Sequence, residues 1–277
     1  MKRSLLLTAA AAVVWMAGVL PAQKPPQIKS KAEQDGYMAV VQGLDPDSRI
    51  KAGEEFLVKF ADSELKAYVL YLIAESYQQK NDGDKMIVYA ERTIEADPNH
   101  YQAMLLLANV LAQRTREFDL DKEEKLTTAE KHAKKAMELL PAAVKPNPNL
   151  PDPQWESAKK FYMGQALQSL GMIAIARKNF DSAIELLKKA VDESPAGDEG
   201  ILVRLGLAYR QAGKYDEAIA TFDQVMNMAD AMPQFKQIAQ AEKVRSTQAK
   251  NAAKPAQPAQ PAAPAQPAAA PAEAKKE

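Results

Sequence analysis

The stretch from residue 202 to residue 222, LVRLGLAYRQAGKYDEAIATF, decides the fold of this chain. Apolar residues recur in it at helical spacing on both sides of Gly213, so we expect two helices joined by a turn. Gly213 lies in that turn, where a left-handed backbone is often needed and glycine adopts it without steric cost. The stretch therefore predicts a helical hairpin.

Two small residues lie where the helices of this hairpin would cross. Gly206 in the first helix and Ala218 in the second leave room for the two backbones to approach closely. Leu205, Tyr209 and Phe222 are then expected to fill the space between the helices.

This pattern resembles the tetratricopeptide repeat, a helix-turn-helix unit of about 34 residues with Leu-Gly-x-x-Tyr in its first helix and Ala-x-x-x-Phe in its second. The preceding unit has the repeat's residue types at Leu167, Leu170, Gly171, Ala174, Ala183, Leu187, Ala190 and Pro195. The resemblance implies that Pro195 ends this hairpin. We also expect Asp181 to cap its second helix.

Earlier units hold the same period, so the resemblance implies an all-α fold. This fold is a right-handed superhelix, or α-solenoid, of about four to five helical hairpins. The expected units cover residues 33–66, 67–100, 101–141, 164–197 and 199–232, and a charged loop is inserted into the third of them at 114–124. The helix expected at 233–250 lacks repeat spacing and would cap the last apolar face.

Prolines divide the expected array into an N-terminal block at 32–141 and a C-terminal block at 154–232. The proline-rich connection between them, 142–153, is either an ordered loop or a flexible joint. Trp155 then opens an unusually long helix that runs toward Ala176 and is expected to pack at this junction.

Both ends of the chain are expected to lie outside the array. Residues 1–22 combine two basic residues, an apolar run and a small residue before a polar stretch, which is typical of a secretory signal peptide cut after Ala22. An uncleaved membrane anchor is the alternative. Residues 23–31 are a linker. The alanine-, proline- and glutamine-rich tail 251–277 is expected to be disordered and partly polyproline II, as a spacer or as a passive tail.

The composition argues against several classes of protein. The 277 residues carry 36 basic and 36 acidic side chains, whereas a nucleic-acid binder would have a basic excess. The absence of cysteine removes disulfides, thiolate metal sites and a lipid-modified cysteine. No phosphate loop, dinucleotide fingerprint or nucleophile elbow is found, so we predict no enzyme activity, no cofactor and no small-molecule substrate.

The two histidines offer no metal site, because neither has a ligand partner three or four residues away. His100 follows the turn at 97–99, and His132 lies on a charged helix face, so both are expected at the surface. Glu123 and Glu124 could bind a cation, but the mixed charges around them favour a solvated loop.

For function, the resemblance implies binding. In tetratricopeptide-repeat proteins the first helices line a concave groove. Carried onto this chain, the groove positions are Tyr68, Tyr71, Glu75, Gln78, Gln79, Gln102, Leu105, Asn109, Gln113, Gln165, Gln168, Met172, Val203, Leu207 and Arg210. Aromatic and amide side chains with few charges suit an extended peptide or a partner helix. Leu105, Met172 and Leu207 could instead pack between repeats.

We therefore predict a non-catalytic protein–protein interaction scaffold or adaptor that is exported to a bacterial periplasm or cell envelope, or secreted. Alternatives are a subunit of an envelope assembly machine for outer-membrane or pilus biogenesis, an accessory subunit of an enzyme complex, and an unrecognised hydrolase. The clamp with which some family members hold chaperone C-termini is not expected, because Leu105 and Gln165 stand where it needs basic residues. The partner is a protein or peptide of unknown identity. Membrane association is expected only if the N-terminal segment stays uncleaved.

Overall fold

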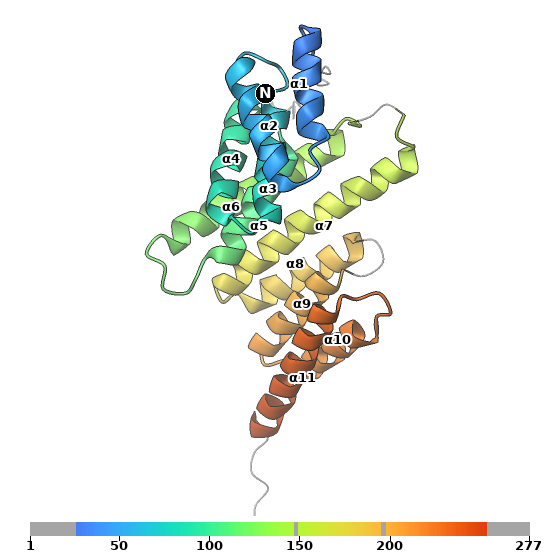
Figure 1. Ribbon diagram of the computed structural model, residues 1–277. Coiled ribbons are helices and arrows are strands. Elements are labelled where there is room, and N and C mark those ends of the chain that lie inside the picture. Colours follow the sequence, from blue (N-terminus) through green and yellow to red (C-terminus); the bar gives the residue numbers. More distant parts are fainter. Residues whose placement is uncertain (1–25, 147–148, 195–197, 254–277) are drawn as a thin grey trace, which may run out of the picture.

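The computed structural model describes residues 26–146, 149–194 and 198–253, and within these ranges the chain forms only helices and their connections (Figure 1). The all-α prediction is confirmed. The signal peptide expected at 1–22, Pro195 and most of the expected tail lie outside the described residues. No helix within the described part of the chain combines the length and the apolar character needed to cross a lipid bilayer.

The first ten α-helices pair into five consecutive hairpins, and α11 lies against the last of them (Figure 1). The pairs are α1 (Lys31–Val41) with α2 (Pro46–Lys59), α3 (Lys66–Gln79) with α4 (Gly83–Ala96), α5 (Tyr101–Arg114) with α6 (Lys122–Leu139), α7 (Asp152–Ala176) with α8 (Phe180–Glu193), and α9 (Glu199–Gln211) with α10 (Tyr215–Asn227). A short 3-10 helix (Leu140–Ala142) follows α6, and α11 covers Pro233–Ala253. The α-solenoid prediction is therefore confirmed.

Two boundaries differ from the expected ones. α11 continues to Ala253, so the tail expected from residue 251 begins later, because no proline breaks the helix before Pro255. The connection between α5 and α6 is confined to residues 115–121, since the acidic residues expected in the inserted loop instead form the first turn of α6. That position suits them because carboxylates stabilise the positive end of a helix dipole.

Close contacts at glycines hold the helices of a hairpin together. A methyl group on Gly206 would lie 2.5 Å from Cε1 of Phe222, and one on Gly171 would lie 2.6 Å from Cγ of Leu187. Non-bonded carbon atoms do not approach this closely, so both positions require glycine's missing side chain. The other repeat positions in these hairpins are buried or partly buried: Leu170, Ala183, Ala190, Tyr209 and Ala218.

Three hairpins share one turn geometry. Asn81, Lys178 and Gly213 have positive φ angles of 55°, 62° and 74°. In each turn the following residue donates its backbone N–H to the carbonyl five positions earlier, as in a Schellman motif. These bonds are Asp82 to Tyr77 at 3.0 Å, Asn179 to Ala174 at 2.8 Å and Lys214 to Tyr209 at 2.9 Å. The left-handed conformation expected for Gly213 is confirmed.

Asn179, not Asp181, caps α8, so that prediction is wrong. The Asn179 side chain accepts a hydrogen bond from the Ser182 N–H. Asp181 is already inside the helix, because α8 begins at Phe180. Its carboxylate instead pairs with Lys214 of the next hairpin at 2.8 Å.

An ion pair joins each hairpin to the helix that follows it. In each case an acidic residue in the first turn of a second helix meets a basic residue at the end of the next helix or, for Lys214, in the turn after it. The pairs are Asp47–Lys80, Asp84–Arg114, Glu123–Arg177, Asp181–Lys214 and Asp216–Lys250. The five acidic residues lie at the positive end of a helix dipole, and four of the basic residues lie at the negative end, whereas Lys214 is the N-cap residue of α10. We call these five contacts the inter-hairpin ion pairs. Because ion pairs at the surface contribute little stability, they do not by themselves hold the fold together.

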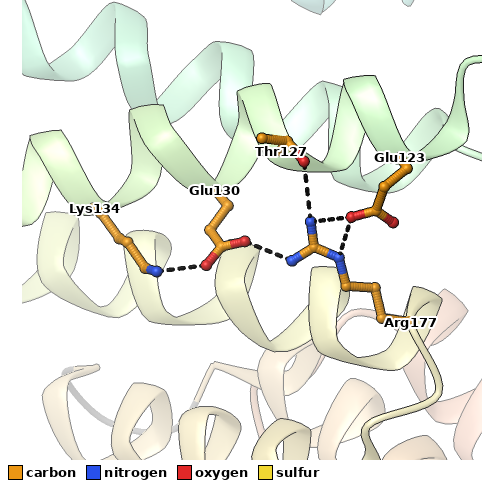
Figure 2. Close-up of polar contacts among 5 residues, drawn as sticks. All are labelled: Glu123, Thr127, Glu130, Lys134 and Arg177. Carbon is orange, nitrogen blue, oxygen red and sulfur yellow. Dashed lines mark hydrogen bonds and ion pairs between the residues drawn. The ribbon is translucent and has the colours of Figure 1, made fainter.

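Arg177 makes the most extensive of these contacts and joins the end of α7 to α6 (Figure 2). Its Nε donates to Glu123 at 2.8 Å, its Nη1 pairs with Glu130 at 2.5 Å, and its Nη2 donates to the Thr127 hydroxyl at 3.3 Å. Lys134 reaches Glu130 from the other side at 2.5 Å. The guanidinium thus binds three side chains along one face of α6.

α7 connects the two halves of the array. It packs on α5 and α6 before it and on α8 after it. Leu170, Met172 and Ile173 of α7 belong to the same hydrophobic core as Val40 of α1. Trp155, in the first turns of α7, is buried. The core therefore continues past the proline-rich connection.

Gly206→Ala is expected to lower the free energy of unfolding by about 1–3 kcal/mol, because the new methyl group would overpack the core against Phe222. This loss exceeds the gain of up to about 1 kcal/mol that alanine brings to a helix. Urea unfolding followed by circular dichroism measures the change.

The double variant Gly206→Ala/Phe222→Leu is the control. The smaller leucine makes room for the methyl group, so the two destabilisations are expected to be less than additive. A Gly206→Ala chain as stable as the wild type would contradict the requirement for close approach.

Candidate functional site

Aromatic side chains from three first helices meet in one row, which we call the aromatic stripe. Its members are Tyr68 and Tyr71 of α3, His100 and Tyr101 at the start of α5, and Phe161 and Tyr162 of α7. α7 contributes to the stripe because it begins well before residue 164, where the repeat period would start it.

The rings of the stripe contact each other. The ring centroids of Tyr71 and His100 are 4.8 Å apart, those of Tyr68 and His100 are 6.0 Å apart, and those of Tyr101 and Tyr162 are 5.4 Å apart. His100 and Tyr101 are consecutive residues at the start of α5, so the two groups of rings meet there. Tilted and edge-on arrangements such as these are favourable for aromatic pairs.

Two members of the stripe keep much of their surface accessible. Tyr68 and Phe161 are each 41% exposed, whereas Tyr71 is half-buried. Burial raises the pKa of the Tyr71 hydroxyl, and the neighbouring Glu75 carboxylate raises that pKa further. Tyr71 is thus a protonated side chain that packs beneath the stripe. Tyr68 and Phe161 provide the solvent-accessible surface of the stripe.

His100 is buried beneath the stripe, so the prediction of a surface position is wrong. Only 6% of its surface is exposed, and its Nδ1 accepts a hydrogen bond from the Ala103 N–H at 3.3 Å. The side chain folds back to cap α5, and the rings of Tyr68 and Tyr71 cover it. Burial lowers the pKa of His100, and Asp97 offsets only part of that effect, so the imidazole is neutral.

Gln102 ties α5 to α7 beside the stripe. Its Nε2 donates a hydrogen bond to the Tyr162 hydroxyl oxygen at 2.9 Å. Because that oxygen acts as the acceptor, the phenol's own proton stays available for donation to another group. The side chain of this predicted groove residue therefore orients a donor at the stripe.

Three of the predicted groove residues line one polar cleft at the other end of α3 and α5. Gln78, Asn109 and Gln113 face it, together with Arg114. Gln113 Nε2 donates to Asn109 Oδ1 at 2.7 Å, and Arg114 pairs with Asp84 at 2.8 Å. The cleft is therefore rich in amide groups that can both donate and accept hydrogen bonds.

Gln168 does not line an open groove, which corrects the prediction. It is buried in α7, and with its amide oxygen turned toward Arg204 it accepts hydrogen bonds from Nε at 3.3 Å and from Nη1 at 3.0 Å. Burial lowers the pKa of Arg204, and the amide offsets part of the cost of burying its guanidinium. Gln168 thus joins α7 to α9.

Arg210 is not free to bind a partner either, because α11 covers it. Its Nε lies 3.1 Å from Oε2 of Glu242, a buried residue of α11 that also pairs with Arg245. α11 packs on α9 and α10, where a further hairpin would otherwise lie. The groove assignment of Arg210 is therefore corrected to a contact with the capping helix.

The other predicted positions divide between the interior and the surface. Leu105, Met172 and Val203 are buried, which agrees with the alternative of packing between repeats for the first two. Leu207 and Gln165 are half-buried. Gln79 is exposed at the end of α3, beyond the stripe.

Sequence reasoning missed Tyr101, Phe161 and Tyr162 as members of the site. Tyr101 precedes the first groove position of its unit, and the α7 residues precede the repeat start at 164. The signal that could have found the α7 residues is the long helix expected from Trp155, since it extends the first helix of that unit backwards.

The described residues contain no group of three or more histidine, aspartate or glutamate side chains that could hold a metal ion. Glu123, considered above for a cation, binds Arg177 instead (Figure 2). The half-buried His132 has a pKa lowered by burial and by Lys131.

Comparisons with known proteins agree with the resemblance inferred from the residues. One tetratricopeptide-repeat family model matches residues 67–100, and a second matches residues 174–241. No sequence among the curated proteins matches the chain.

Two solved structures share the fold at low sequence identity. TTC0263, a tetratricopeptide-repeat protein of Thermus thermophilus, superposes with a TM-score of 0.54 at 16% identity, over 76% of this chain and 99% of that chain. MamA of Desulfovibrio magneticus, from residue 41 to its end, gives a TM-score of 0.51 at 16% identity, over 73% of this chain and 96% of that chain. These similarities support the fold and say nothing of partners.

His100→Asn is expected to flatten the pH dependence of stability between about pH 5 and pH 6.5. The folded state keeps His100 neutral because its pKa is lowered, so the unfolded state binds more protons as the pH falls below about 6.5, and wild-type stability falls with it. Asparagine retains the helix cap but does not titrate. Unfolding midpoints measured across this pH range give the slope.

His132→Asn is the matched control. Because His132 is only half-buried, its removal is expected to flatten the slope less than removal of His100. An unchanged slope in His100→Asn would show that His100 does not titrate as inferred.

Proposed function

Because the chain is a tetratricopeptide-repeat protein, we propose that it is a non-catalytic scaffold whose aromatic stripe binds an extended peptide of a partner protein. The tetratricopeptide-repeat fold implies a protein–protein interaction scaffold, and such proteins are generally not enzymes. The specific part of the proposal is the site, which comprises the stripe across α3, α5 and α7 and the polar cleft at the other end of α3 and α5.

The observation that carries the proposal is the accessible surface of Tyr68 and Phe161, set on a rigid base of packed rings. Aromatic side chains supply large contact areas with few rotatable bonds, so they dominate the binding energy of many interfaces. The rings and hydroxyls of the stripe are already ordered, which reduces the entropy lost on binding.

An extended peptide fits this surface better than a helix does. The backbone N–H and C=O groups of an extended segment are unpaired and need partners, whereas a helix has satisfied most of its own. The Tyr162 hydroxyl beside Gln102 and the amides of Asn109 and Gln113 can supply such partners. A bound helix would leave these polar groups without a role.

We also propose that the protein is exported from the cytoplasm. The basic start, apolar run and small residue at 1–22 support export, and the absence of cysteine fits a protein that needs no disulfides outside the cytoplasm. We place the scaffold in a bacterial periplasm or cell envelope. A subunit of an envelope assembly machine is the second candidate, because it would use the same peptide-binding site.

The double variant Tyr68→Ala/Phe161→Ala is expected to weaken retention of the partner at least about tenfold, since each truncated hot-spot residue costs more than about 1 kcal/mol of binding energy. Affinity capture from an envelope extract of the source cells, followed by quantitative mass spectrometry, measures the retention.

Phe118→Ala is the matched control, because Phe118 is a 92% exposed aromatic residue in the loop before α6, outside the stripe. This variant is expected to retain the partner as the wild type does. Full retention by the stripe variant would exclude the stripe as the binding site.

Expression of the full chain in a bacterial host is expected to yield a mature protein that begins at Gln23 in the periplasmic fraction. The intact mass and N-terminal sequence of the fractionated protein test this. An intact Met1 in the membrane fraction would indicate the alternative, an uncleaved anchor.

A further inference from the structure

Five prolines follow the end of α11 at intervals of three residues: Pro255, Pro258, Pro261, Pro264 and Pro267. A polyproline II helix has about three residues per turn and rises about 3.1 Å per residue. In that conformation all five rings would lie along one edge, about 9 Å apart. We call residues 255–267 the proline segment.

The proline segment matches the chemistry of the aromatic stripe. It contains only proline, alanine and glutamine, so it carries no charge. Burial raises the pKa of Tyr68, Tyr71 and Tyr101 and lowers the pKa of His100, so these rings of the stripe carry no charge at neutral pH. The Glu75 carboxylate lies beside Tyr71. Grooves lined by aromatic rings bind polyproline II segments, since flat rings pack on proline rings and donors reach the exposed carbonyls. At the stripe, the Tyr162 hydroxyl beside Gln102 is such a donor.

The distance between successive prolines of the segment also matches the distance between the helices that carry the stripe. Packed helices lie about 8–10 Å apart, which is close to the separation of successive prolines along the edge. α5 and α7 pack on each other and carry Tyr101 and Phe161 of the stripe. Successive prolines can therefore meet rings on neighbouring helices.

The start of the segment lies far from α3 of its own chain. α11 contacts α9 and α10, and it ends at the opposite end of the array from α3 (Figure 1). Pro255 follows Ala253 by two residues, which span at most about 7 Å. The first prolines of the segment therefore stay near the end of α11, whereas a second copy can offer its stripe to all five prolines.

We propose that the proline segment of one copy binds the aromatic stripe of a second copy. This contact joins two different surfaces, so it is heterologous and links copies head to tail. The inference rests on the proposed peptide site and names its occupant. A partner peptide at the same stripe would compete with this self-association.

Sedimentation velocity of the mature full chain at rising concentration tests the proposal. The weight-average mass of the wild type is expected to rise above that of one chain. A chain with a scrambled tail, of identical composition but with prolines moved off the three-residue interval, is expected to stay at the mass of one chain. So is Tyr68→Ala/Phe161→Ala, whose folding circular dichroism verifies, whereas Phe118→Ala is expected to associate as the wild type does.

Mixing the two defective chains gives the decisive result. The scrambled-tail chain retains an intact stripe and the stripe variant retains an intact tail, so together they are expected to form a one-to-one complex and nothing larger. A wild type that stays at one chain's mass, a scrambled tail that associates normally, or a mixture that does not pair would overturn the proposal. Partner capture that depends on the stripe would then still support the proposed function, so the two failures are distinguishable.

Discussion

The close approach of two helices at a glycine is the constraint on which the rest of this structure depends. Where Gly206 meets Phe222 and Gly171 meets Leu187, any side chain on the glycine would force the helices of a hairpin apart. When the two helices of a hairpin cross at a fixed distance and angle, the hairpin presents a fixed apolar face to the next hairpin. The stacking of hairpins, and with it the position of every first helix, follows from these contacts.

The inter-hairpin ion pairs then favour one way of stacking successive hairpins. Each inter-hairpin ion pair joins the start of a second helix to the end of the next helix or, at Lys214, to the turn after it, so the acidic charge compensates a helix dipole in every pair. Exposed pairs of this kind contribute little energy singly. Their regular placement nevertheless favours one register of stacking over a slipped one, because a slip would move each charge away from its partner. The Arg177 contacts fulfil this role where the loop before α6 interrupts the repeat period (Figure 2).

The stripe illustrates how an irregularity in a repeat array produces a distinctive surface. A regular unit would begin near residue 164 and would leave Tyr101 without aromatic neighbours on the next helix. The extension of α7 back to Asp152 brings Phe161 and Tyr162 beside α5. The buried, neutral His100 completes the row by capping α5 between the stripe's tyrosines and the helix. Binding chemistry therefore concentrates where the repeat pattern breaks.

Much of the fold could be predicted because the packing residues are local signals. The spacing of Gly206, Tyr209 and Phe222 reports a hairpin within one stretch of chain, and its recurrence reports the array. The site was predicted less well. Tyr68 and Asn109 do face solvent or the cleft, whereas Gln168 is buried against Arg204.

By itself, the sequence determined the helical hairpins and their period, because helix packing within a unit depends on residues a few positions apart. The sequence also determined the zero net charge of the chain and the three-residue interval between prolines in the tail. Only the tertiary structure decided which faces stay open. α11 covers Arg210, and α7 extends to form the stripe, because contacts between residues far apart in the chain depend on how complete elements pack. Local spacing carries no information about such contacts.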